Sequence, residues 1–296
     1  MFEGIYTPIV TPFKENEEID FESLKHNLDR WGKSPLAGIL ALGSNGEFPH
    51  LSLEERIEVV RFVRENFDPG KKVMAGITCD TTAGTVELSK RVAELGADAA
   101  LVLPPYYYKG MMTEEVLLHH FTEVANRSPI PVMLYNMPAN TGINLPASLV
   151  TELSKHANIV GIKDSSGNIV QIAQCVYGSA QDFRVFAGSA SFMLPAFAVG
   201  ARGATVALGN IMPAECCQVL ELFNSGQLEE ARKQQLRLLE INHTVTRGWG
   251  IPALKAAMDI LGYRGGELRR PLQPLSKQQK SELQEILKRA TTWAAN

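Results

Sequence analysis

The sequence has little cysteine and no long hydrophobic run, and both absences narrow what the protein can be. Four cysteines in 296 residues, two of them adjacent at Cys216 and Cys217, match neither a disulfide framework nor a zinc-binding spacing. No apolar run approaches the ~18 residues that a membrane span requires, and the amino terminus lacks a signal-peptide pattern. We therefore expect reduced thiols in a cytoplasmic protein that does not engage a membrane.

The chain also lacks an excess of positive charge. Its 29 basic residues are balanced by 32 acidic ones, and they form no basic run, so nucleic acid is not an expected partner. The pair His119 and His120 has no neighbouring cluster of cysteines or carboxylates. We interpret this pair as helix surface or interface, and we expect no metal.

What the chain does have is an alternation of short apolar segments with amphipathic ones. Helical spacing follows each apolar segment, and Ser52 with Glu55 forms the pattern of a capping box before one such helix. Repeated strand–helix units within residues 1–225, with strands that are almost continuously apolar, predict a closed (β/α)8 TIM barrel rather than an open sheet. The expected strands are 4–8, 38–42, 72–77, 99–103, 132–136, 159–163, 184–187 and 204–208.

After residue 225 the strand pattern stops. Helical spacing continues over 228–241, 252–261 and 277–293, with a turn-rich connector at 262–274. We expect residues 1–225 to form the catalytic barrel and residues 226–296 to form a helical segment packed on it.

One lysine, Lys163, lies in an unusually apolar segment of the sequence. Lys163 ends a β-branched run that begins at Ile159, and lysine is rarely buried without a partner or a task. Desolvation disfavours the ammonium form, so such an amine can act as the nucleophile that forms a Schiff base with a ketone. The alternative is a strand-end lysine whose ammonium reaches solvent or pairs with a carboxylate.

The other strand ends bear on this choice, because the active site of a β/α barrel lies at the carboxyl ends of its strands. The second expected strand is followed by Gly43, Ser44, Asn45 and Gly46. Two glycines allow a tight turn that exposes amide groups, and such a loop suits a carboxylate. A plain turn is the alternative, and the spacing is not that of a dinucleotide-binding loop.

Tyrosines lie at two neighbouring strand ends. Tyr106, Tyr107 and Tyr108 follow the fourth expected strand, where they could pack at an interface or supply a phenol for proton transfer. Tyr135 ends the fifth strand, and we expect it within reach of the Lys163 amine on the sixth. These groups together favour the Schiff-base hypothesis.

The last two strand ends indicate the kind of substrate. Gly188 follows the seventh strand, where a glycine leaves room for a ligand. Barrels that bind phosphate carry glycine-rich loops after strands 7 and 8, but residues 208–213 contain no such loop and no basic residue. A free acid is therefore expected rather than a sugar phosphate.

These segments resemble, in order and spacing, the dihydrodipicolinate synthase/N-acetylneuraminate lyase family of class I aldolases. The matching motifs are Gly-Ser-Asn-Gly-Glu at 43–47, Tyr107, Tyr-Asn-Met-Pro at 135–138 and Gly-Ile-Lys-Asp at 161–164. The similarity runs over nearly the whole chain, including the helical tail. It implies a pyruvate-dependent carbon–carbon lyase that uses neither a metal nor an organic cofactor.

The resemblance also implies roles for individual residues. Lys163 would form an imine with the ketone of pyruvate or another 2-oxo acid, and Tyr135 would carry protons in a relay through Ser44. Tyr107 would complete that relay from a neighbouring subunit, so a homotetramer is expected. The residues expected to bind substrate are Ser44, Asn45, Gly46, Asn140, Ser165, Gly188 and Thr205.

Two departures separate this chain from the synthases of the family. Those enzymes usually carry Thr-Thr where Ser44 and Asn45 stand, and an arginine that binds the aldehyde's carboxylate where Asn140 stands. The motifs are more similar to those of 4-hydroxy-2-oxoglutarate aldolases, which release pyruvate and glyoxylate. Related sugar-acid aldolases with a Ser-Asn loop are also similar, so a related 4-hydroxy-2-oxo acid that yields pyruvate and another aldehyde is a further possibility. One alternative is a 4-hydroxy-tetrahydrodipicolinate (dihydrodipicolinate) synthase, which condenses pyruvate with aspartate semialdehyde. Another is a regulatory protein that binds a 2-oxo acid without turnover.

Overall fold

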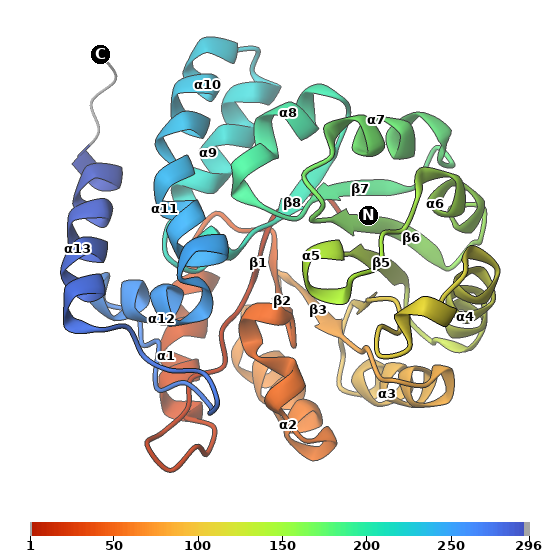
Figure 1. The fold of residues 1–296 in the computed structure, drawn as a ribbon, viewed down its shortest axis with the longest axis horizontal. Helices are drawn as coiled ribbons and strands as arrows, with labels where there is room; N and C mark the ends of the chain where they lie inside the picture. The colour runs from red at the N-terminus through yellow and green to blue at the C-terminus, as the bar shows by residue number, and fades with distance from the viewer. Residues whose placement is uncertain (1, 293–296) are drawn as a thin grey trace.

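Within residues 2–292, which the computed structural model describes, eight parallel strands close into a barrel. Each strand pairs with the next along the chain, and β1 closes the barrel against β8, with Ile5 opposite Ala204. Figure 1 shows the helices arranged around this barrel. The strands are β1 (Gly4–Pro8), β2 (Gly38–Ala41), β3 (Lys72–Gly76), β4 (Ala99–Val102), β5 (Val132–Asn136), β6 (Ile159–Asp164), β7 (Arg184–Ala187) and β8 (Gly203–Thr205).

The strands are almost continuously apolar because both of their faces are covered. Every residue of β2, β4 and β5 is buried, as expected when side chains fill the barrel on one face and helices pack on the other. The predicted (β/α)8 barrel is confirmed.

The eighth strand is shorter than predicted. It ends at Thr205, and Ala207–Asn210 forms a 3₁₀ turn instead of extending the strand to residue 208. The side-chain amide of Asn210 donates to the carbonyls of Pro8 and Ala207, both at 2.9 Å. These bonds turn the chain back over the barrel end, a long-range effect that the local apolar pattern does not reveal.

A helix or helical turn follows each strand. The predicted capping box of α2 is present, with Ser52 Oγ accepting from Glu55 N at 3.2 Å and Glu55 Oε2 accepting from Ser52 N at 2.8 Å. The barrel helices are α1 (Phe21–Gly32), α2 (Leu53–Asn66), α3 (Thr82–Glu94), α4 (Glu114–Arg127), α5 (Pro138–Thr141), α6 (Ala147–Leu153), α7 (Ile169–Gly178), α8 (Met193–Ala198) and α9 (Pro213–Asn224).

The rest of the described chain is helical. It forms α10 (Leu228–Arg237), α11 (Leu239–His243), a π-helical turn at Thr244–Gly248, α12 (Gly250–Ile260) and α13 (Lys277–Thr292). Helix α10 packs against α9, and α12 packs against α13. Figure 1 shows α12 and α13 in blue beside the barrel. The predicted last helix ended at residue 293, which lies outside the described residues, as does the end of the predicted segment 226–296. No helix in the described chain is both long enough and apolar enough to cross a membrane.

The cysteines agree with expectation and one histidine does not. None of the four cysteines, all within the described residues, forms a disulfide. His119 is exposed, but His120 is only 4% exposed and its Nδ1 lies 2.8 Å from Thr82 Oγ1. The pair was interpreted as helix surface or interface; His119 lies at the surface, whereas His120 lies on the buried face of α4, against Thr82 of α3.

Candidate active site

Lys163 and Tyr135 lie side by side at the carboxyl end of the barrel. They occupy paired positions on β6 and β5, and both side chains are buried, Lys163 with 3% exposure. The Lys163 ammonium nitrogen lies 4.1 Å from the centroid of the Tyr135 ring. The expected proximity of the amine and the phenol is confirmed by this geometry.

The phenol of Tyr135 is surrounded by polar groups. Its hydroxyl hydrogen-bonds with Ser44, Ser165 and Lys163. Burial by itself raises the pKa of Tyr135, but the charge of Lys163 and the hydrogen bonds with the two serines outweigh burial, and the pKa lies below its ordinary value. A phenol with a lowered pKa, in contact with an amine and two hydroxyls, is suited to proton transfer.

The turn after β2 brings Ser44 to this phenol. Ser44–Gly46 forms one 3₁₀ turn, in which Gly46 N donates to Gly43 O at 3.0 Å. A Cβ atom at Gly46 would lie 3.1 Å from the carbonyl oxygen of Ile9, so the chain passes close to β1 at that point. Ser44 and Asn45 remain half-buried, with their side chains available near the barrel mouth.

A buried polar network lies directly behind Lys163 and Tyr135. The next residues on the same strands are Asp164 and Asn136, and their side chains point to the opposite face. Asp164 Oδ2 accepts from Asn136 Nδ2 at 2.8 Å and from Gln171 Nε2 at 3.1 Å. These bonds hold the ends of β5 and β6 together, so the spacing of the amine and the phenol is set from outside the barrel.

Three further predicted residues lie on β6, β7 and β8 or directly after them. A Cβ atom at Gly188 would lie only 1.9 Å from Ser165 Oγ, so the room that this glycine leaves is occupied by Ser165. Thr205, on β8, is fully buried, and its hydroxyl oxygen has no hydrogen-bond partner among the described residues.

A cavity of about 360 Å³ opens beside the Ser44 turn and is lined by Asn140 on α5 as well as by Ser44. A smaller hollow lined by Tyr135 shares Ser44 and Phe48 with it. Tyr106, the first of the three consecutive tyrosines, also lines the cavity, as do Ile251 and Leu272. Among the described residues, neither lysine nor arginine lines it.

Tyr107 does not reach Lys163 within its own chain. Its side chain is 77% exposed, and its ring packs edge-on against Tyr108, with centroids 5.0 Å apart. The geometry thus assembles the other predicted catalytic side chains, Lys163, Tyr135 and Ser44, and leaves Tyr107 on the surface.

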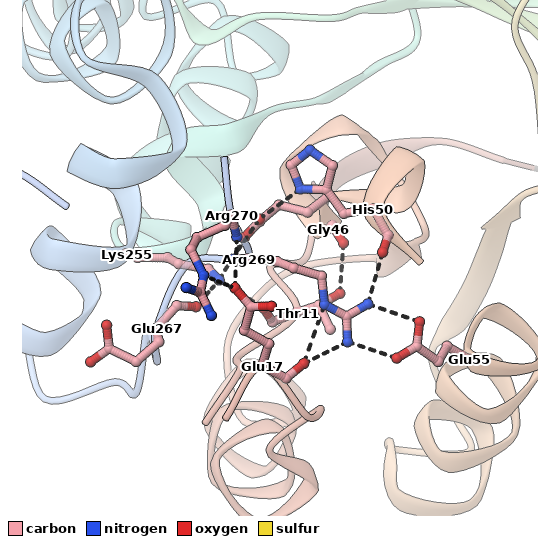
Figure 2. A network of polar contacts seen from close by, with 10 residues as sticks. Thr11, Glu17, Gly46, His50, Glu55, Lys255, Glu267, Arg269 and Arg270 are labelled. Carbon is pink, nitrogen blue, oxygen red and sulfur yellow. Dashed lines mark hydrogen bonds and ion pairs between the residues drawn. The ribbon is translucent and has the colours of Figure 1, made fainter. Parts of the chain in front are cut away.

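A second group of residues, which no sequence motif predicted, contacts the segment that follows the Ser44 turn. Lys255 on α12 forms an ion pair with Glu47. Arg269 in the following connector donates to the carbonyl of His50 (Figure 2). Lys255 carried a signal that could have found it, since it lies in an apolar helix, just as Lys163 lies in an apolar strand. In residues 2–292, no three histidine, cysteine or carboxylate side chains come together in a way that could hold a metal ion.

Comparisons with known proteins place this chain in a family. Residues 1–290 match the model of the dihydrodipicolinate synthetase family. The chain is 36% identical over 287 residues to a probable mitochondrial 4-hydroxy-2-oxoglutarate aldolase of Emericella nidulans, covering 95% of this chain and 93% of that one. It is also 36% identical over 290 residues to a 4-hydroxy-tetrahydrodipicolinate synthase of Caldicellulosiruptor saccharolyticus, covering 98% and 96%.

A solved structure extends the comparison. The chain is similar to YagE, a prophage protein of E. coli K12 from the dihydrodipicolinic acid synthase family, solved in complex with pyruvate; the TM-score is 0.92 at 29% identity, covering 98% of this chain and 99% of that one. The resemblance indicated by the motifs is confirmed. The expectation of an enzyme is confirmed too, because members of this family are pyruvate-dependent class I aldolases or lyases.

Proposed function

Because this chain belongs to the dihydrodipicolinate synthetase family, we propose that Lys163 forms an imine with a 2-oxo acid and that the substrate is 4-hydroxy-2-oxoglutarate. One observation carries the proposal: a buried amine lies against a phenol, and no carboxylate of the described residues pairs with it. A structural lysine at this depth would need such a partner. A nucleophilic lysine needs a free amine instead.

The chemistry follows from that amine. The Lys163 nitrogen adds to the C2 carbonyl of the substrate, and loss of water gives a protonated imine. Removal of the proton from the C4 hydroxyl then breaks the C3–C4 bond; glyoxylate leaves, and the bonding electrons pass into the imine to give an enamine. Protonation at C3 and hydrolysis release pyruvate and regenerate the amine.

Tyr135 and Ser44 are the proposed proton carriers. The phenol contacts both the amine and the Ser44 hydroxyl, so a proton can pass between the imine nitrogen and the substrate oxygen without leaving the site. We assign the carboxylate next to the ketone to Ser44, Asn45 and the Gly46 backbone. The unpartnered hydroxyl of Thr205 is consistent with a place in the same pocket, beside Ser165 and Gly188.

Asn140 supports glyoxylate, rather than aspartate semialdehyde, as the aldehyde product. In aspartate semialdehyde the carboxylate is separated from the aldehyde by two further carbons, so binding it calls for a distant cationic partner. The cavity offers the Asn140 amide and, among the described residues, no lysine or arginine. In glyoxylate the carboxylate is attached to the aldehyde carbon, so that an amide and nearby backbone groups suffice.

Trapping tests the imine. Incubation with pyruvate and borohydride should add the mass of one reduced pyruvate adduct to the intact protein, and peptide mapping should place it on Lys163. The same treatment without pyruvate is the control. Wild-type protein that stays unlabelled, or a label on another lysine, would exclude the mechanism.

A comparison of two substrates tests the proposal that the enzyme cleaves 4-hydroxy-2-oxoglutarate. We expect a higher kcat/KM for cleavage of 4-hydroxy-2-oxoglutarate than for condensation of pyruvate with aspartate semialdehyde. The synthase activity is the second candidate, because a synthase relative is as similar in sequence as the aldolase relative. Asn140→Arg should shift the ratio toward the semialdehyde. A wild-type preference for the semialdehyde would favour the synthase.

We further propose that Tyr107 completes a neighbouring site in a homotetramer, since it is exposed whereas its own Lys163 is buried. Tyr107→Phe and Lys163→Ala chains should each have little activity alone. Coexpressed as hybrids, they should recover activity in sites that take Lys163 from one chain and Tyr107 from the other. Hybrids no more active than the parent variants would exclude a shared site.

A further inference from the structure

The turn proposed to bind the carboxylate ends on a buried glutamate with an unusual backbone. Glu47 follows Gly46 directly and has a φ of 53°, in the left-handed region that residues other than glycine seldom adopt. Its side chain is 1% exposed. A residue persists in such a conformation only where its surroundings hold it, so the contacts of Glu47 determine the shape of the turn.

Lys255 on α12 supplies the main contact. Its ammonium nitrogen lies 2.6 Å from Glu47 Oε1 and donates to the backbone carbonyls of Thr11 at 2.9 Å and Glu267 at 2.6 Å. Two of the three ammonium N–H groups therefore donate to backbone carbonyls. The contact with Glu47 is an ion pair, and Glu47 Oε1 has no hydrogen bond from the described residues. Burial lowers the pKa of Lys255, while the negative charge of Glu47 opposes that decrease.

Thr11 connects this ion pair to the turn itself. Its carbonyl accepts from Lys255, and its hydroxyl donates to the carbonyl of Gly46 at 2.8 Å; Figure 2 shows Thr11 between Lys255 and Gly46. The turn is thus held at Gly46 through Thr11 and at the adjacent Glu47 through the carboxylate.

Arg269 holds the other side of the same segment. Its backbone N–H donates to Glu47 Oε2 at 3.3 Å, and its guanidinium donates to the carbonyl of His50 at 2.8 Å. The guanidinium also forms a two-pronged ion pair with Glu55, at 2.7 and 2.8 Å (Figure 2). Residues 46–55 are therefore tied to a part of the chain more than 200 positions away.

We propose that Glu47 and Lys255 are positioning residues, which hold Ser44–Gly46 in the shape that binds the carboxylate of the 2-oxo acid. Neither residue touches the reacting atoms in this assignment; they act through the turn. On this account the helical segment after the barrel takes part in substrate binding. The inference rests on the proposed function, because it needs a 2-oxo acid bound at Lys163.

The test measures how pyruvate saturates imine trapping. In Glu47→Gln, which keeps the size of the side chain and removes its charge, we expect the half-saturating pyruvate concentration to rise at least tenfold. The trapping rate at saturation should stay within about threefold of wild type, because the amine and the phenol are untouched. Glu240→Gln removes an exposed ion pair with Arg289 in the same helical segment and should saturate like wild type.

A double variant separates positioning from stability. Lys255→Met alone leaves the buried Glu47 carboxylate without its lysine partner, but Glu47→Gln with Lys255→Met removes both buried charges and should fold. We expect this double variant to keep the weak pyruvate saturation and to show faster hydrogen exchange at residues 44–46. Wild-type saturation in Glu47→Gln and in the double variant would overturn the inference. An unlabelled wild type would overturn the proposed function, and the inference with it.

Discussion

Two lysines of this chain are almost equally buried, yet their surroundings are opposite. Lys163 is 3% exposed and Lys255 is 2% exposed. Lys255 has a carboxylate and two carbonyls around its ammonium. Lys163 lies against the ring of Tyr135, and in the described chain no carboxylate pairs with it.

The difference teaches that burial alone does not identify a functional lysine. A buried charge is tolerated when it is paired and hydrogen-bonded, and Lys255 has an ion pair with Glu47 and two hydrogen bonds to backbone carbonyls. In the described chain Lys163 has no ion pair, and proteins retain such uncompensated groups mainly where function requires them. We therefore expect substitutions of the two lysines to affect different properties, one chiefly activity and the other chiefly stability.

The largest effect is expected from Lys163→Met. Loss of the amine removes the nucleophile, so kcat/KM for cleavage should fall at least about 1000-fold. The free energy of unfolding should not decrease, because no ion pair is broken. Lys155→Met, at an exposed lysine paired with Glu152, is the matched control and should keep wild-type activity. A clear loss of stability in Lys163→Met with activity retained would reverse the comparison.

Lys255→Met should show the opposite pattern. Removing the ammonium leaves the buried Glu47 carboxylate without its lysine partner and with only His50 Nδ1 and the Arg269 backbone N–H near Oε2, each at 3.3 Å. The free energy of unfolding should therefore fall by about 3–5 kcal/mol, as measured by urea denaturation. Adding Glu47→Gln should restore part of that loss, since no buried charge remains. If Lys255→Met alone is as stable as wild type, the ion pair has no structural role and the contrast between the two lysines fails.

Tyr135→Phe tests whether the phenol beside Lys163 transfers protons or only packs against the amine. The ring beside the amine stays and only the hydroxyl is lost, so kcat should fall roughly 100-fold through the missing proton transfer. Thermal unfolding should change little. A wild-type kcat would mean that Ser44 or water carries the proton, and that the contact between phenol and amine is packing alone.

The barrel could be predicted from sequence because its signal is local. Each strand is a short apolar run and each helix has its own spacing, so the fold needed no knowledge of distant contacts. The end of β8 was missed because the side chain of Asn210 bonds to Pro8, about 200 residues away.

In the candidate site too, residues with a local sequence signal could be predicted, whereas those that depend on distant contacts could not. Lys163 was recognised from its own strand, and Tyr135 from its place on the neighbouring one. Lys255 could have been found by the same reasoning, but its partner Glu47 is far away in sequence, and no pattern joins the two. Ile251 and Leu272 line the cavity only because the helical segment folds back over the barrel. The exposure of Tyr107 is likewise a result of tertiary structure.

His120 is a third buried basic side chain, beside Lys163 and Lys255, and we expect the smallest effect from its substitution. His120 has one hydrogen-bond contact, with Thr82, and within residues 2–292 its Nε2 has no partner. Burial, with a smaller contribution from the charge of His119, lowers the pKa of His120 from 6.5 to about 4. The folded protein therefore keeps this ring neutral, whereas the unfolded chain takes up a proton below pH 6.5.

The contribution of His120 to stability should be present above pH 6.5 and be lost as the pH falls toward 4. At pH 4.5 the wild type should have lost about 2 kcal/mol through this group relative to pH 7. His120→Gln cannot titrate, so its free energy of unfolding should fall less over the same range, as measured by urea denaturation at several pH values. If the free energy of unfolding has the same pH dependence in the two proteins, His120 takes up a proton equally readily in the folded and the unfolded chain. A buried histidine would then be tolerated here without an ion pair and without a pKa shift, so the comparison of the two lysines would not extend to it.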